Sequence, residues 1–227
     1  MEEKYFGGET LEMKNLYIYC EGQTEESFIN EILAPYFANI MIFVTPIICT
    51  TKRTATKKYT GGVQDYNKIK TELIIISKQH KQEYVTTMFD YYAMPANTPN
   101  INCLERDIYK RMELIEAAIN QDIGQSNCFF NFMLHEFEGI LFSEPEAFAE
   151  IADGQTVEEI QQIRNEALSP EHINNSPETA PSKRLEALIP NYAKVKNGTL
   201  LSKNIGIDKI LSECRHFRNW IEKIKNI

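Results

Sequence analysis

The sequence lacks the cysteine arrangements that stabilise small secreted domains and zinc sites. Its 227 residues include five cysteines, an odd number, and none of them forms a C-x-x-C pair: Cys20, Cys49, Cys103, Cys128 and Cys214. Scattered cysteines argue against a disulfide framework or a structural zinc site and are typical of a reduced protein. We therefore expect a cytoplasmic chain.

Long apolar runs are also missing. No stretch approaches the roughly 20 residues that span a bilayer. The first residues, "MEEKYFGGETLE", are acidic and lack the apolar segment of a secretory signal. With 43% hydrophobic and 25% charged residues, the composition is that of an ordinary globular protein. We expect no membrane partner, and we expect residues 1–12 to lie outside the core.

Several catalytic signatures are absent. The sequence contains no G-x-x-x-x-G-K-[ST] phosphate loop, no G-x-S-x-G elbow and no H-E-x-x-H zinc motif. The chain is therefore not expected to hydrolyse ATP by itself. Its net charge of -8 argues against non-specific binding of nucleic acid over the whole surface, although a local basic surface is compatible with it.

Strand and helix patterns alternate through the first 143 residues. Apolar or β-branched segments at 15–20, 40–49, 83–89 and 127–134 predict four strands, and amphipathic segments at 25–37, 64–79 and 104–121 predict the helices between them. This alternation predicts an α/β fold with a mainly parallel four-stranded sheet flanked by helices. Pro46 suggests that the second strand lies at an edge of the sheet or contains a bulge.

Strand patterns disappear after residue 143. The segments 156–168, 182–189 and 207–227 have helical patterns. We therefore predict an α/β core over residues 13–143 and a helical C-terminal portion over residues 144–227, packed onto the core as one structural unit.

Carboxylates follow three of the four predicted strands. Glu21 ends the first strand, with Glu25 one helical turn later; Asp90 ends the third strand; Glu136 and Glu138 follow the fourth. In a parallel sheet these strand ends share one edge, and carboxylates that meet there repel one another unless a cation neutralises them. Hard oxygen ligands favour Mg²⁺ or Mn²⁺. All five acids are candidate ligands, and Glu21, Asp90 and Glu136 are candidate catalytic residues.

Each of these acids, taken alone, also fits a turn or a helix cap, so their recurrence at three strand ends carries the metal hypothesis. His135, beside Glu136, fits a ligand, an acid/base group or a hydrogen-bonded histidine, and we favour the last.

Two basic segments are candidates for contact with nucleic acid. One contains Lys52, Arg53, Lys57 and Lys58 without an acid, and the other places Lys183 and Arg184 at the start of a predicted helix. The rings of Tyr59, Tyr91 and Tyr92 can stack on bases or sugars. A solubilising loop with core tyrosines explains the same residues equally well. In the last helix we expect Arg215, His216, Arg218 and Lys223 to be mostly solvated, opposite a buried face of Phe217, Trp220, Ile221 and Ile224.

Several stretches resemble known sequences. "YIYCEGQTEE" resembles the first motif of Toprim domains, in the E-G-x-T-E form of the overcoming-lysogenization-defect (OLD) nucleases. "MFDYYAMP", "HEFEGILFS", "SPETAPSKRL" and "CRHFRNW" resemble a bacterial Toprim-like family of unknown function. The resemblance covers nearly the whole chain from residue 14. Members of that family often lie beside ABC- or SMC-type ATPases, in contexts that suggest phage defence.

The resemblance implies roles for individual residues. Glu21 would be a general acid/base or metal ligand, Glu25 the second glutamate of the OLD-like form, and Asp90 the aspartate after the third strand. Where Toprim domains usually have D-x-D, this sequence has Asp90-Tyr91-Tyr92, so the second acid is missing. From their positions, Glu136 or Glu138 could supply that charge.

The expected function is therefore metal-dependent phosphodiester hydrolysis, together with an ABC- or SMC-type ATPase in phage defence or DNA maintenance. As the nucleic-acid partner we favour DNA over RNA, and the sequence leaves open which of the two is the substrate. The alternative is a non-catalytic subunit of the same fold that senses or docks onto nucleic acid or the ATPase, which Tyr92 favours. The sequence leaves open whether the chain forms a homodimer.

Overall fold

The strands form one parallel sheet. A computed structural model describes residues 12–49, 65–173 and 179–227. The strands are β1 (Lys14–Cys20), β2 (Ile42–Ile48), β3 (Tyr84–Asp90), β4 (Cys128–Phe129) and β5 (Phe132–Met133). Their order is β2-β1-β3-β4, β5 also pairs with β3, and every pair is parallel. The predicted α/β class with a mainly parallel sheet is confirmed, and β2, which contains Pro46, is at an edge.

The predicted fourth strand is divided into β4 and β5, so the sheet has five strands rather than four. Side chains replace the ladder hydrogen bonds at the break. The Thr87 hydroxyl donates to the Asn131 carbonyl and accepts from the Asn131 amide, both at 2.8 Å. The amides of Phe130 and Phe132 donate to the side chains of Asn120 and Glu116. The segment stays buried and hydrogen-bonded without forming a continuous strand.

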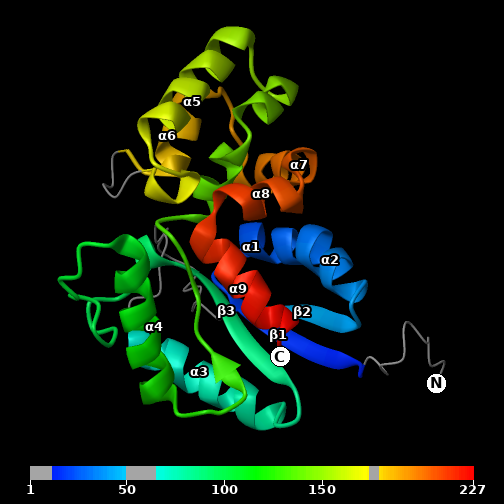
Figure 1. Ribbon diagram of the computed structural model, residues 1–227, viewed down its shortest axis with the longest axis vertical. Helices are drawn as coiled ribbons and strands as arrows, with labels where there is room; N and C mark the ends of the chain where they lie inside the picture. Colours follow the sequence, from blue (N-terminus) through cyan, green and yellow to red (C-terminus); the bar gives the residue numbers. More distant parts are fainter. Residues whose placement is uncertain (1–11, 50–64, 174–178) are drawn as a thin grey trace, which may run out of the picture.

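Helices cover both faces of the sheet. On one face lie α3 (Tyr66–Gln79) and α4 (Ile108–Ile123), whose apolar residues share a core cluster with β3. On the other lie α1 (Gln23–Phe28), α2 (Ala34–Ala38) and the final helix α9 (Arg215–Lys225) (Figure 1).

The first predicted helix contains a π-helical turn, η1 (Ile29–Leu33), between α1 and α2. At its C-terminal end the Ala34 amide donates to the Ile29 carbonyl, five residues earlier. Pro35 follows directly and has no N–H to donate to the preceding turn. The helix therefore widens locally and continues.

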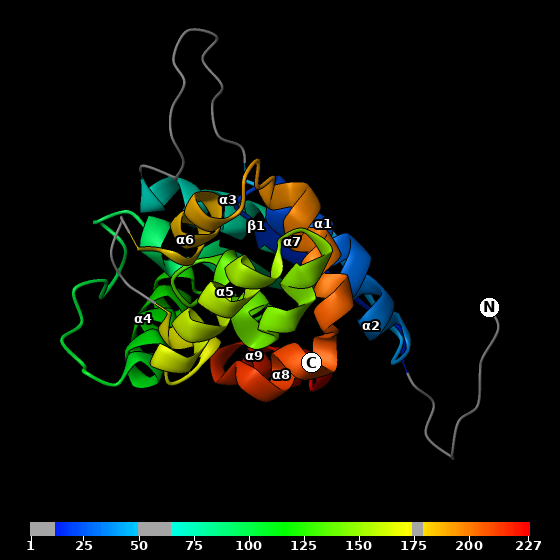
Figure 2. The ribbon, with the colours of Figure 1, turned by 90° about the horizontal axis from the view of Figure 1, so that it is seen from above.

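The C-terminal portion is helical. The 3-10 helix η3 (Phe137–Ser143) ends the core portion. The C-terminal portion contains the 3-10 helices η4 (Pro145–Glu150) and η5 (Pro170–His172), and the helices α5 (Gly154–Glu166), α6 (Pro181–Leu188), α7 (Lys194–Ile205), α8 (Ile207–Glu213) and α9. Helices α5 to α8 lie beyond the edge of the sheet at which the strands end, and Figure 2 shows the same layer from above.

The two portions share one core. A single apolar cluster contains Leu16 and Ile18 of β1 together with Phe217 and Trp220 of α9. The indole Nε1 of Trp220 donates to Thr86 Oγ1 in β3 at 3.0 Å. The sheet and the final helix therefore contribute side chains to the same apolar cluster.

Helix α7 corresponds to no predicted segment. Asn197 and Gly198, near its middle, have low helix propensity. Gly198 instead allows close packing, because a Cβ there would lie 3.1 Å from Cε1 of Phe137 and 3.6 Å from Cγ2 of Thr24. Tertiary contacts therefore stabilise a helix that local preference does not predict.

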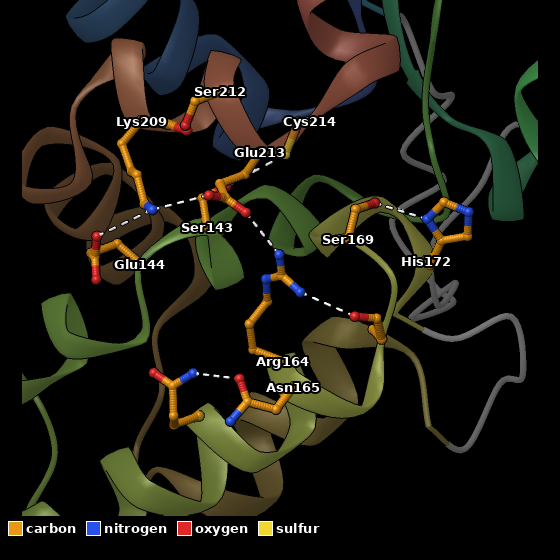
Figure 3. A network of polar contacts seen from close by, with 12 residues as sticks. Ser143, Glu144, Arg164, Asn165, Ser169, His172, Lys209, Ser212, Glu213 and Cys214 are labelled. Carbon is orange, nitrogen blue, oxygen red and sulfur yellow. Dashed lines mark hydrogen bonds and ion pairs between the residues drawn. The ribbon is translucent and has the colours of Figure 1, made fainter.

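An ion-pair network joins α5 to α8 (Figure 3). Arg164 Nη2 lies 2.7 Å from Glu213 Oε2, and Lys209 Nζ lies 3.0 Å from Glu213 Oε1 and 3.8 Å from Glu144 Oε2. The network joins α5 and α8 to each other and to Glu144, the residue before η4.

Within the described ranges, every helix is too short or too polar to cross a membrane.

Candidate metal centre

The parallel sheet brings the predicted acids to one edge. Glu21 directly follows β1 and Asp90 ends β3, and the register pairs Cys20 with Met88 on these neighbouring strands. Asp90 in turn pairs with Met133, three residues before Glu136. Glu25 lies in the first turn of α1, and Glu138 lies in η3. We call these five residues the acidic cluster: Glu21, Glu25, Asp90, Glu136 and Glu138.

The acids of the cluster are close enough to affect one another. Burial, and then the charges of Glu25, Glu21, Glu138 and Glu136, raise the pKa of Asp90 well above its ordinary value. Burial, followed by the charge of Glu25, also raises the pKa of Glu21 to about 7, although a hydrogen bond from the Asp90 amide opposes this rise. The folded chain therefore brings these carboxyl groups together at the end of the sheet, where burial and mutual repulsion disfavour their ionised forms.

Two further carboxyls of the cluster have raised pKa values. Burial is the main cause for Glu138, whose pKa rises to about 7, and also for Glu25. Both are nearly inaccessible, with Glu138 4% and Glu25 7% exposed. Carboxylates buried this deeply are costly unless a cation or hydrogen-bond donors compensate them.

Three buried polar atoms around the cluster have no hydrogen-bond partner among the described residues. They are Glu21 Oε2, the Ser182 hydroxyl and the Tyr192 hydroxyl. Ser182 adjoins the cluster because its amide donates to Glu136 Oε2, and the charge of Glu138, after burial, raises the pKa of Tyr192. Buried polar atoms without a protein partner are the places where a bound ion or water supplies one.

Other oxygens of the cluster are engaged by the backbone. Glu25 Oε2 accepts from the Gly22 amide at 2.9 Å, Asp90 Oδ1 from the Phe137 amide at 2.9 Å, and Glu136 Oε2 from the Ser182 amide at 3.0 Å. In the described part of the chain, no three acids, histidines or cysteines already surround a common point as metal ligands do. The donor set suits a hard cation, and gathering it around one ion requires side-chain rotations.

Lys194 belongs to this region, and the sequence analysis missed it. Its Nζ lies 3.6 Å from Glu138 Oε1 and 3.9 Å from Glu186 Oε1. Burial lowers the pKa of its ammonium, but the charges of Glu138 and Glu136 outweigh this effect and raise the pKa. Lys194 is the first residue of α7, a position where a cation opposes the helix dipole. A lysine at the first position of a helix could have indicated a nearby acidic partner, but this position is recognised only once the bounds of α7 are known.

His135 is buried and close to the cluster. Burial, and then the charge of His172, lower its pKa to about 4, so the imidazole is neutral at physiological pH. Its φ of 63° is in the left-handed region, and its carbonyl accepts from the Tyr92 amide at 3.2 Å. The Tyr92 side chain is 41% exposed.

The predicted basic segments give less support to a nucleic-acid site than the acidic cluster gives to a metal site. Lys52, Arg53, Lys57 and Lys58 lie outside the described residues. Lys183 forms a 2.6 Å ion pair with Glu186, and Arg184 Nε donates to the Thr179 carbonyl at 2.8 Å. Both side chains therefore have local partners.

The final helix departs from the prediction at one position. Its predicted apolar face is confirmed, since Phe217, Trp220, Ile221 and Ile224 are all buried. Of the four polar residues expected to be mostly solvated, only His216 is buried. Its ring is 6% exposed and lies 3.0 Å from Glu116 Oε1, because α9 packs its first turn against α4.

One family model matches the chain, over residues 20–225, and its description is a domain of unknown function, DUF4276. The match includes the whole acidic cluster and Lys194. No curated protein and no solved structure matches the chain. The chain therefore belongs to the DUF4276 family.

Proposed function

We propose that the protein is a divalent-metal-dependent, Toprim-like nuclease that hydrolyses phosphodiesters. The observation that carries the proposal is the acidic cluster at the carboxyl edge of the parallel sheet, with the buried and unpartnered Glu21 Oε2 in it. Ligands of open α/β sheets bind at this edge.

The residues present suit Mg²⁺ or Mn²⁺. Glu21, Asp90 and Glu138 would hold the ion, joined by Glu136 or Glu25 when one of their oxygens turns from its backbone donor. When bound, the metal would activate water and stabilise the charge that develops on the phosphate. Glu21 Oε2, which has no hydrogen-bond partner among the described residues, would accept the proton of the attacking water.

The proposed substrate is DNA rather than RNA, and the proposed partner is an ABC- or SMC-type ATPase acting in phage defence or DNA maintenance. Both come from the resemblance of the E-G-x-T-E, D-Y-Y and H-E-F-E stretches to Toprim-like sequences. The missing phosphate loop supports the proposal of an ATPase partner, because any ATP hydrolysis would then be carried out by another chain.

A second candidate is a non-catalytic sensor or docking subunit with the same fold. Two observations favour it. Tyr92 stands where a second acid is usual, and Glu25, Asp90 and Glu136 each accept a backbone hydrogen bond that gives them a structural role.

Cleavage assays with supercoiled plasmid and single-stranded DNA, with and without Mn²⁺, separate the two candidates. We expect nicking that requires Mn²⁺, stops with a chelator and falls by several orders of magnitude in Glu21→Gln, while DNA binding persists. Glu158→Gln is the matched control, because Glu158 is exposed on α5, outside the cluster. DNA binding without metal-dependent cleavage, unaffected by Glu21→Gln, would favour the docking subunit.

A further inference from the structure

Lys194 is placed where its own helix disfavours it. It is the first residue of α7, and the positive end of the helix dipole favours acids rather than lysine at that position. Its Nζ points back to buried Glu138, 3.6 Å away, and to the more exposed Glu186, 3.9 Å away. The acids therefore compensate the unfavourable position of the lysine.

The backbone of α7 is held against the segments that carry the cluster. Gly198 packs against Phe137, the residue after Glu136, and against Thr24, the residue before Glu25. The start of α7 thus has a set position relative to the acids. The Lys194 side chain is still 41% exposed, so its ammonium can move toward solvent.

We propose that Lys194 is the internal counter-cation of the acidic cluster, and that it stabilises the metal-free fold and competes with the divalent ion for the cluster. The inference rests on the proposed function, because it assumes that a metal binds there. Glu186, whose side chain is 37% exposed, offers the displaced ammonium a second carboxylate, so metal entry requires a side-chain movement and no unfolding.

Lys194 is expected to have opposite effects in the metal-free and the metal-bound protein. Without metal, Lys194 offsets repulsion among buried carboxylates, as the lowering effect of its charge on the pKa values of Glu21, Glu25 and Glu138 also indicates. With metal, two cations occupy one acidic site and repel each other. Removing the lysine charge should therefore weaken the metal-free fold and strengthen metal binding.

The test compares Lys194→Met with Lys196→Met. Lys196 is exposed two residues later in the same helical turn, so its replacement makes the same change of net charge away from the cluster. Lys194→Arg keeps the charge and shows whether packing alone matters. Thermal unfolding in a chelator and calorimetric titration with Mn²⁺ are measured for all variants.

For Lys194→Met we expect the metal-free melting temperature to fall by about 2–4 °C relative to Lys196→Met. We expect its Mn²⁺ affinity to rise about tenfold, since repulsion between a divalent ion and an ammonium a few ångströms away is worth about one decade even in a water-like dielectric. Lys194→Arg should stay close to wild type in both.

Equal Mn²⁺ affinity in Lys194→Met and wild type, or weaker binding by the variant, would overturn the inference and leave the metal centre standing. If neither protein binds Mn²⁺, the proposed function fails and the inference fails with it.

Discussion

At the scale of single residues, Glu21 is the central residue of the proposed metal site. It follows an apolar strand, it is surrounded by other acids, and one of its oxygens has no described partner. A carboxyl in this environment favours its protonated form until a cation arrives. Its protonation is therefore linked to the stability of the metal-free fold.

The metal-free protein should lose stability as the pH rises from about 5 to 8. The pKa values of Glu21 and Glu138 are near 7 in the folded state and ordinary in the unfolded state, so the unfolded chain releases these protons first. Stability from such groups is present below the unfolded pKa and is lost as the pH rises through the folded pKa. Each carboxyl contributes about 2–3 kcal/mol.

Urea unfolding in a chelator at pH 5.5 and pH 8 measures this loss. Glu21→Gln should lose less stability than wild type over the same range, since its amide does not titrate. Identical losses in the two proteins would show that Glu21 titrates normally.

At the scale of elements, helix α7 joins the C-terminal portion to the site. It places Lys194 beside Glu138, and Gly198 sets how closely it approaches η3. A glycine within a helix usually costs stability relative to alanine, so its presence here reflects packing.

Gly198→Ala should lower the free energy of unfolding by about 1–2 kcal/mol, because the new methyl would meet the buried ring of Phe137 at 3.1 Å. Gly154→Ala, at the start of α5, is the control, since a Cβ there meets nothing within 4 Å. That control should be neutral or stabilise the protein by up to about 1 kcal/mol. Chemical denaturation measures the unfolding free energies of the two variants. Equal changes in both would mean that α7 does not need to approach Phe137 closely.

The elements also show which parts of the fold could be predicted from the sequence and which could not. The strands β1 and β3 and the acids after them were predictable, because β-branched runs and strand ends are local features. The break at Asn131 and the helix α7 were not, because they depend on partners distant in sequence, Thr87 for the first and Phe137 with Thr24 for the second. The same limit applies to Lys194, whose role depends on the position of α7.

At the scale of the whole molecule, the final helix completes the core that the first strand begins. Trp220 packs in the same cluster as Leu16 and donates to Thr86. The sheet and the helical portion should therefore unfold together.

Trp220 is the only tryptophan in the chain, so its fluorescence reports the docking of α9. Denaturant transitions followed by tryptophan fluorescence and by far-ultraviolet circular dichroism should coincide, as for a two-state unit. Trp220→Phe, followed by circular dichroism, should lower the unfolding free energy by about 1–3 kcal/mol through the lost hydrogen bond and packing. An earlier fluorescence transition would instead indicate a helical portion that unfolds separately.

The central claim is that the acidic cluster is a metal centre built around Glu21. The most direct test is the stability of Glu21→Gln relative to wild type, first in a chelator and then in millimolar Mn²⁺. In the chelator at pH 8, the variant should be as stable as wild type or more stable by up to about 2–3 kcal/mol, because the substitution removes a buried charge from among like charges. In Mn²⁺ the order should reverse, because only the wild type gains the full binding term RT ln(1 + [L]/Kd). A variant that loses the same stability in both conditions would contradict the account and make Glu21 a structural residue.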